Sequence, residues 1–163
     1  MRKLTLLITT LFALSFNFTA CGKDDNDLKP EIHNEKGNDS ETENKSMKLQ
    51  VTIGETVQTA TLADNSTAKD FISLLPLTVK LDDYAGSEKI FYPERKLSTK
   101  GAGSINAVAG DITYYFPWGN VAIFYKNFGN SNSLIRIAKF DSNIDVLKGK
   151  GSIDNVKFEL IEE

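Results

Sequence analysis

Short stretches of alternating apolar and polar residues follow one another from Met47 to Ile161, and this period of two is typical of β-strands with one buried face. The pattern predicts strands over Met47–Ile53, Thr56–Leu62, Leu77–Leu81, Glu88–Tyr92, Ile112–Phe116, Val121–Tyr125, Leu134–Phe140 and Val156–Ile161. Many short strands at close spacing are typical of a small barrel. We therefore predict a mainly β fold, a closed barrel of about eight strands with one or two short helices.

One segment has a helical period instead. Apolar residues recur at three- and four-residue spacing from Ala68 to Leu75, the oxygen-bearing side chains of Asn65–Thr67 can cap a helix start, and Pro76 ends the pattern. We predict a helix over Thr67–Leu75 that closes one end of the barrel. A single helical turn is expected at Asn143–Leu147.

The stretch Gly110–Tyr125 is the densest run of β-formers and aromatic residues in the chain. Pro117–Asn120 has the composition of a four-residue turn between two predicted strands, so we predict a β-hairpin. Trp118, the only tryptophan, lies at this turn, where a large ring is hard to bury completely. The hairpin is therefore the part of the chain expected to line a pocket.

Three connections between the predicted elements contain residue types that occur in binding or catalytic sites. Ser98–Ala109 is a long Gly/Ala/Ser-rich loop, and such loops are usually functional or mobile. It lacks the Lys-Ser/Thr ending and the strand-to-helix context of a phosphate-binding loop. Asn127–Ser133 is expected to be a turn-rich link. Asp82 and Asp83 resemble an acid/base pair or a metal site in composition, but adjacent residues on an extended chain point to opposite faces. We expect a solvated turn there, and no metal site or cofactor.

The N-terminus has the pattern of an export signal. Met1–Lys3 is basic, Leu4–Phe18 is apolar but too short for a comfortable membrane span, and Cys21 follows small residues. Residues 1–20 therefore resemble a bacterial lipoprotein signal peptide, which implies that Cys21 is lipidated and anchors the chain to a membrane. Cys21 is also the only cysteine, which excludes an intrachain disulfide and a thiol enzyme.

Residues 21–46 are expected to form a disordered acidic tether, since they are too polar to offset chain entropy by burial. Lys23–Asp25 resembles the tag that directs lipoproteins of Bacteroidota to the outer face of the outer membrane. His33, the only histidine, falls in this tether, so histidine chemistry is not available to the domain. From Lys48 onward the chain has 13 basic and 14 acidic residues, and this balance indicates no nucleic-acid partner.

Several motifs in one order resemble the bacterial cyclophilin-like domain family. They are Thr67–Phe71, Leu74–Thr78, Asp83–Gly86, Glu88–Ile90, Arg95–Leu97, Gly110–Ile112, Pro117–Asn120, Ala122–Tyr125 and Ser133–Ile135. The similarity spans residues 47–161 and implies a small closed barrel, so we assign residues 47–163 to one cyclophilin-like domain. Members of the family mostly have no established activity.

Besides a purely structural or partner-docking role, the resemblance leaves two functions open. The first is a non-catalytic module of the cell envelope that binds a peptide or a small molecule. The second is a peptidyl-prolyl isomerase for exported proteins, although the Phe-Met-x-Gln string of classical cyclophilins is missing. For that activity Arg95 is the candidate donor, with Arg136 as the other arginine of the domain. The candidate pocket residues are Tyr92, Phe116, Trp118 and Phe124. The competing interpretation makes Arg95 a surface cation and the aromatic residues part of the barrel core.

Overall fold

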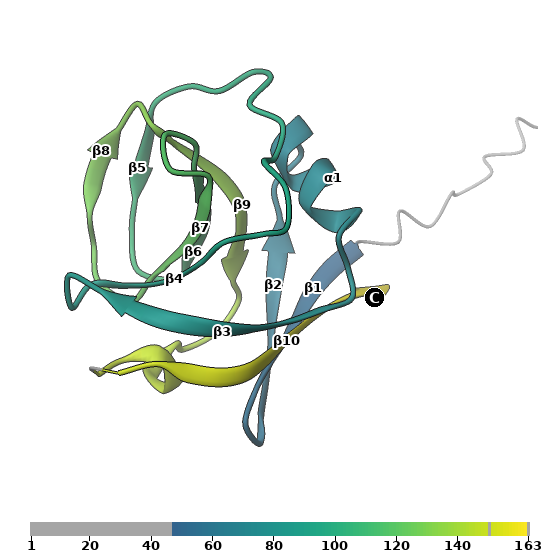
Figure 1. The fold of residues 1–163 in the computed structure, drawn as a ribbon, viewed down its shortest axis with the longest axis vertical. Coiled ribbons are helices and arrows are strands. Elements are labelled where there is room, and N and C mark those ends of the chain that lie inside the picture. The colour runs from purple at the N-terminus through teal and green to yellow at the C-terminus, as the bar shows by residue number, and fades with distance from the viewer. Residues whose placement is uncertain (1–46, 150, 163) are drawn as a thin grey trace, which may run out of the picture. The chain divides into compact units, whose positions relative to one another are not determined.

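Eight antiparallel strands close into a barrel in a computed structural model that describes residues 47–149 and 151–162 (Figure 1). The strands are β1 (Met47–Ile53), β2 (Thr56–Leu62), β3 (Leu77–Tyr84), β4 (Glu88–Phe91), β6 (Asp111–Tyr115), β7 (Asn120–Phe124), β9 (Leu134–Phe140) and β10 (Ile153–Glu162). Their order around the barrel is β1-β10-β3-β4-β7-β6-β9-β2, and β2 pairs again with β1. The predicted barrel is confirmed. The predicted signal peptide, Cys21 and the tether lie outside the described residues.

The helix α1 (Ser66–Ile72) starts as the sequence indicates, because the Asn65 side chain accepts a hydrogen bond of 2.8 Å from the Ala68 amide. It ends three residues earlier than predicted. The ring of a proline disfavours the helical conformation of the preceding residue, here Leu75, and the chain leaves the helix ahead of Pro76. Phe71 is fully buried and packs edge-on against Phe158 of β10, with ring centroids 6.2 Å apart.

The expected single turn exists as the 3-10 helix η1 (Asp145–Leu147). No helix among the described residues is long and apolar enough to cross a membrane.

A second, smaller sheet was not predicted. β5 (Ile105–Ala107) pairs with β8 (Gly129–Ser131), within the two segments that we expected to be loops. Each strand has three residues and few β-formers, so local propensity does not specify it. Packing stabilises it instead: Ala107 forms an apolar cluster with Ala122, Phe124 and Leu134 of the barrel wall.

The barrel wall beneath this sheet is apolar on both faces. Ile112, Val121 and Ile123 point inward into the main core, whereas Ala122 and Phe124 of the same hairpin point outward into the small cluster. All five residues of β7 are buried as a result. The outer face of β7 is therefore the place where a site can form without disturbing the core.

Asp83 corrects the expectation of a solvated turn, since β3 continues through Tyr84 and the side chain of Asp83 is held in a network. Its Oδ1 accepts hydrogen bonds from Tyr125 (2.6 Å) and from Lys89 (2.9 Å), and both bonds lower the pKa of Asp83. Lys89 is only 2% exposed and also donates to the carbonyl oxygens of Gly149 and Gly151. No cluster of metal-ligating side chains occurs in the described part of the chain.

We expect Lys89→Met to lower the free energy of unfolding by about 3 kcal/mol, because it removes the cation paired with Asp83 and the donor of two carbonyl groups. Urea unfolding measures the change. Lys80→Met on the adjacent strand is the matched control, since the exposed pair of Lys80 with Asp82 at 3.7 Å is worth at most about 0.5 kcal/mol. Equal costs for the two variants would contradict a structural role for Lys89.

Candidate functional site

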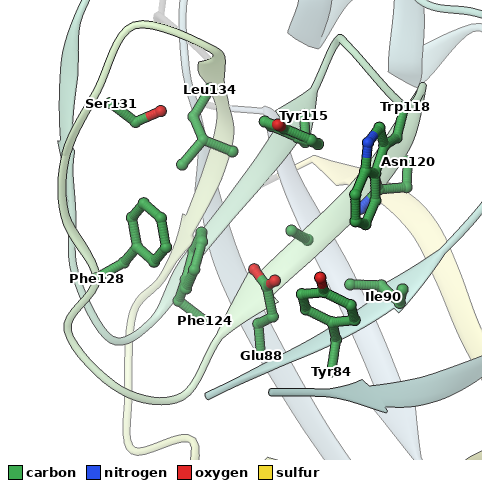
Figure 2. A pocket seen from close by; sticks show the side chains of 11 residues that line it. Tyr84, Glu88, Ile90, Tyr115, Trp118, Asn120, Phe124, Phe128, Ser131 and Leu134 are labelled. Carbon is green, nitrogen blue, oxygen red and sulfur yellow. The ribbon is translucent and has the colours of Figure 1, made fainter. Parts of the chain in front are cut away.

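A pocket of about 260 Å³ lies on the outer face of the barrel, between β3, β4, β6, β7 and the small sheet (Figure 2). We name it the outer pocket. Its lining residues are Tyr84, Glu88, Ile90, Tyr115, Trp118, Asn120, Ala122, Phe124, Phe128, Ser131 and Leu134. Strand alternation explains the set, because Glu88 and Ile90 of β4 and Asn120, Ala122 and Phe124 of β7 project to the same side.

Five aromatic rings line the pocket. Trp118 packs edge-on against Tyr84 and Tyr115, with centroid distances of 5.6 Å and 5.5 Å, and Phe124 packs against Phe128 at 5.1 Å. Trp118 is 52% exposed even though it is the largest apolar side chain available to the core. Large exposed rings around a hollow are typical of a binding surface rather than of a core.

Glu88 is the only charged residue in the lining. Figure 2 shows its carboxylate in the middle of the pocket, between Phe124 and Tyr84. No hydrogen bond or ion pair joins it to another described residue, so burial acts without compensation and raises the pKa of Glu88 to about 7. An unpaired carboxyl in an apolar hollow is a common feature of functional sites.

Asn120 is a second unpaired polar group. The side chain is 2% exposed, and its Oδ1 has no hydrogen-bond donor among the described residues. Its Nδ2 reaches only the carbonyl of Val121, at 3.5 Å. A buried acceptor without a donor is costly and is uncommon in native structures. The outer pocket therefore holds two oxygen-bearing groups that lack a partner.

The small sheet is fixed to the barrel by an ion pair. Asp111 is fully buried and accepts hydrogen bonds from Nε (3.0 Å) and Nη2 (2.9 Å) of Arg136 and from the amide of Val108 (2.9 Å). Nη2 of Arg136 also donates to the carbonyl of Asn106 in β5, at 3.2 Å. Bidentate pairing of this kind fixes geometry, and here it holds β5 against β6 and β9.

Of the residues predicted from the sequence, the structure brings Trp118 and Phe124 together in the outer pocket. Phe116 is partly buried against the main core. Tyr92 is 60% exposed and lines a different hollow, beside Pro93 and Ser73.

Arg95 lies against α1 instead of the outer pocket. Its Nη2 donates to Oδ1 of Asp70 at 2.5 Å and to Oγ of Ser73 at 2.7 Å, and the hydrogen bond with Asp70 raises the pKa of Arg95. The same bond lowers the pKa of Asp70. Its guanidinium is thus part of a surface ion pair that joins α1 to the segment after β4.

The sequence did not indicate that five other residues line a pocket: Glu88, Asn120, Tyr84, Tyr115 and Phe128. Glu88 alternates along its strand like any solvent-facing residue, and only the cover supplied by the small sheet makes its surroundings apolar. One signal was available: the run Val121–Tyr125 is continuously apolar, and such strands are usually buried on both faces.

The comparisons with known proteins identify the domain. The model of the cyclophilin-like family matches residues 51–159. Among solved structures, a hypothetical protein from Archaeoglobus fulgidus, determined in solution, is similar with a TM-score of 0.56 and 18% identity, over 70% of this chain and 94% of that one. At this identity the likeness concerns the fold alone. No curated protein matches the chain.

We expect the free energy of unfolding to fall as the pH rises from about 4.5 to 7, in the part that Glu88 contributes. The folded protein binds its proton with a pKa of about 7, against 4.5 ordinarily, so ionisation is penalised only in the folded state. Glu88→Gln should therefore be more stable than the wild type by about 1–2 kcal/mol near pH 8, after allowance for solvent screening, and equal to it near pH 4.

Urea unfolding at both pH values measures this difference. Glu55→Gln, in the exposed turn between β1 and β2, is the matched control and should change stability at neither pH. A stability difference for Glu88→Gln that does not vary with pH would contradict the assignment.

Proposed function

The chain belongs to the cyclophilin-like family, and from this premise we propose that its barrel is a non-catalytic binding module for a small molecule or one side chain of a peptide. The ligand occupies the outer pocket. The observation that carries this proposal is the pair of unpartnered groups, Glu88 and Oδ1 of Asn120, within a hollow of exposed aromatic rings. Their desolvation is unfavourable in the empty pocket and is offset when a ligand supplies donors.

The size of the pocket limits the ligand. At about 260 Å³ it lies just below the range of about 300–1,000 Å³ usual for drug-sized molecules. A group of roughly ten non-hydrogen atoms, or a single side chain, fits that space. The open rim at Trp118 and Phe128 allows the remainder of a larger ligand to stay in solvent.

Prolyl isomerisation was the alternative. It requires a donor that favours the twisted amide, and Arg95 was the candidate for it. Arg95 is engaged by Asp70 and Ser73 outside the outer pocket, and Arg136 is engaged by Asp111. No observation at the outer pocket favours catalysis over binding, so retention of a ligand is the function that we propose.

We further propose that lipidated Cys21 anchors the module to the outer membrane, facing the cell exterior. The proposal rests on the sequence pattern of residues 1–20 and on Lys23–Asp25. The polar tether would let the domain stand clear of the membrane surface.

For the binding function we expect ligand-observed NMR with aromatic and aliphatic fragments to detect weak ligands. Trp118→Ala should weaken them about tenfold, because truncation removes roughly 1–2 kcal/mol of ring contact. Tyr92→Ala is the matched control, since that ring is equally exposed but lies outside the outer pocket. Unchanged binding by Trp118→Ala would contradict the site. Faster cis-trans exchange of an Ala-Pro peptide, abolished by Arg95→Ala, would overturn the non-catalytic assignment.

For the anchor we expect the full-length chain, produced in a bacterium that processes lipoproteins, to incorporate labelled palmitate and to sediment with the outer membrane. Cys21→Ser should remove both properties. Replacement of Lys23–Asp25 by alanine should leave the label and abolish digestion by protease added to intact cells. Labelling that survives Cys21→Ser would contradict lipidation at this residue.

A further inference from the structure

The electrostatic character of the outer pocket restricts the ligand class. Glu88 is an anion when ionised, and Oδ1 of Asn120 is the negative end of an amide dipole. The surrounding rings of Tyr84, Tyr115 and Trp118 have negative faces, which attract cations and repel anions. None of the lining residues is Lys or Arg. The pocket therefore favours a positive charge.

The two unpaired oxygen-bearing groups also require hydrogen-bond donors. A quaternary ammonium has none, whereas a protonated primary amine has three. In an apolar surrounding a charge-assisted hydrogen bond from ammonium to carboxylate is stronger than one in water, because fewer water molecules compete for either partner. The ligand should thus be an amine in its protonated form.

Strand geometry separates the two groups along the pocket. Glu88 pairs across the sheet with Phe124, and Asn120 lies four residues further along β7 on the same face. Four residues of a strand span about 13 Å, so one small polar group does not reach both. Ala122, whose side chain is short, and Ile90 form the apolar floor between them. This arrangement fits a ligand with an ammonium at one end and an apolar stem.

Resting on the proposed binding function, we propose that the outer pocket selects a protonated primary amine on an apolar stem, with Glu88 holding the ammonium. The amine belongs either to a free alkyl or aryl amine or to the lysine side chain of a peptide. In the second case a backbone amide beyond the stem is available to donate to Asn120.

The pH dependence of binding supports a direct test. An ammonium needs the ionised form of Glu88, whose pKa in the empty pocket is about 7, so affinity falls about tenfold from pH 8 to pH 6. The other titratable groups that line the pocket are the phenols of Tyr84 and Tyr115. On the opposite face of β4, Lys89 and Asp83 bind each other, and burial together with Asp83 raises the pKa of Tyr125 to about 12.

The experiment titrates the purified full-length chain at pH 8 and pH 6, with the fluorescence of Trp118 as the signal. The probes are 2-phenylethylamine and 2-phenylethanol, which match in shape and differ in charge. We expect the amine to bind at least about tenfold more tightly than the alcohol at pH 8, as bonds to charged groups exceed neutral ones. This preference should disappear in Glu88→Gln and at pH 6, and it should persist in Glu55→Gln.

A second pair of probes distinguishes the two sources of the amine. N-acetyl-lysine-N-methylamide is compared with its Nε-acetylated form. Tighter binding of this lysine amide than of 2-phenylethylamine assigns the ligand to a peptide, and the reverse order assigns it to a free amine. If Asn120→Ala no longer binds the lysine amide more tightly than 2-phenylethylamine, Asn120 accepts a hydrogen bond from the backbone amide of the ligand.

The contrary outcomes are distinct. If the alcohol binds as tightly as the amine, the amine proposal is overturned and the binding function stands. If the amine keeps its preference in Glu88→Gln, the assignment to Glu88 is overturned. If no probe and no fragment binds, the amine proposal and the binding function both fail.

Discussion

The outer pocket depends on one ion pair, between the buried Asp111 and the partly exposed Arg136. It is the contact through which β6 and β9 of the barrel hold β5 of the small sheet, by three hydrogen bonds to Asp111 and one from Arg136 to the carbonyl of Asn106. Without the small sheet, Phe124 and Leu134 would lie on an open barrel wall. An ion pair that removes a carboxylate from water gains little net stability, but loss of Arg136 would leave the buried charge of Asp111 uncompensated, which is strongly unfavourable. The pair therefore fixes position more than it adds stability.

Neighbouring residues of β4 show how strand alternation separates a structural charge from a functional one. Lys89 points to the inner side of the barrel wall, where Asp83 and two carbonyl oxygens satisfy it, with the ring of Tyr125 5.5 Å away. Glu88 points outward into a hollow where no described residue binds it. Lys89 is buried and Glu88 is half-buried, yet only Glu88 has unused capacity to bind a ligand. The barrel interior is filled by side chains, so the outer face is where a ligand has room.

The sequence predicted the barrel well because its signals are local. Alternation gave β1, β2 and β9 with their observed ends, and the observed cap residue of α1, Asn65, lies within the predicted capping segment Asn65–Thr67. The small sheet was missed because Gly129–Ser131 has low strand propensity and is ordered only by pairing with β5 and packing on the barrel. The site was likewise predictable only where its signals are local. Trp118 and Phe124 belong to a recognisable hairpin, whereas the importance of Glu88 comes from residues far from it in sequence.

The polarity of the outer pocket bears on the choice between binding and isomerisation. Rotation about an X-Pro bond is promoted by an apolar cleft with a donor directed at the amide, since the barrier of about 18–20 kcal/mol reflects loss of amide resonance. The outer pocket has the apolar cleft, but its unpaired groups are a carboxyl, ionised above a pKa of about 7, and an amide oxygen. Above that pKa both oxygen-bearing groups accept hydrogen bonds and therefore bind donors. A pocket with this polarity is suited to retaining a cationic donor, and none of its lining residues is an arginine that could direct a fixed cationic donor at a twisted peptide bond.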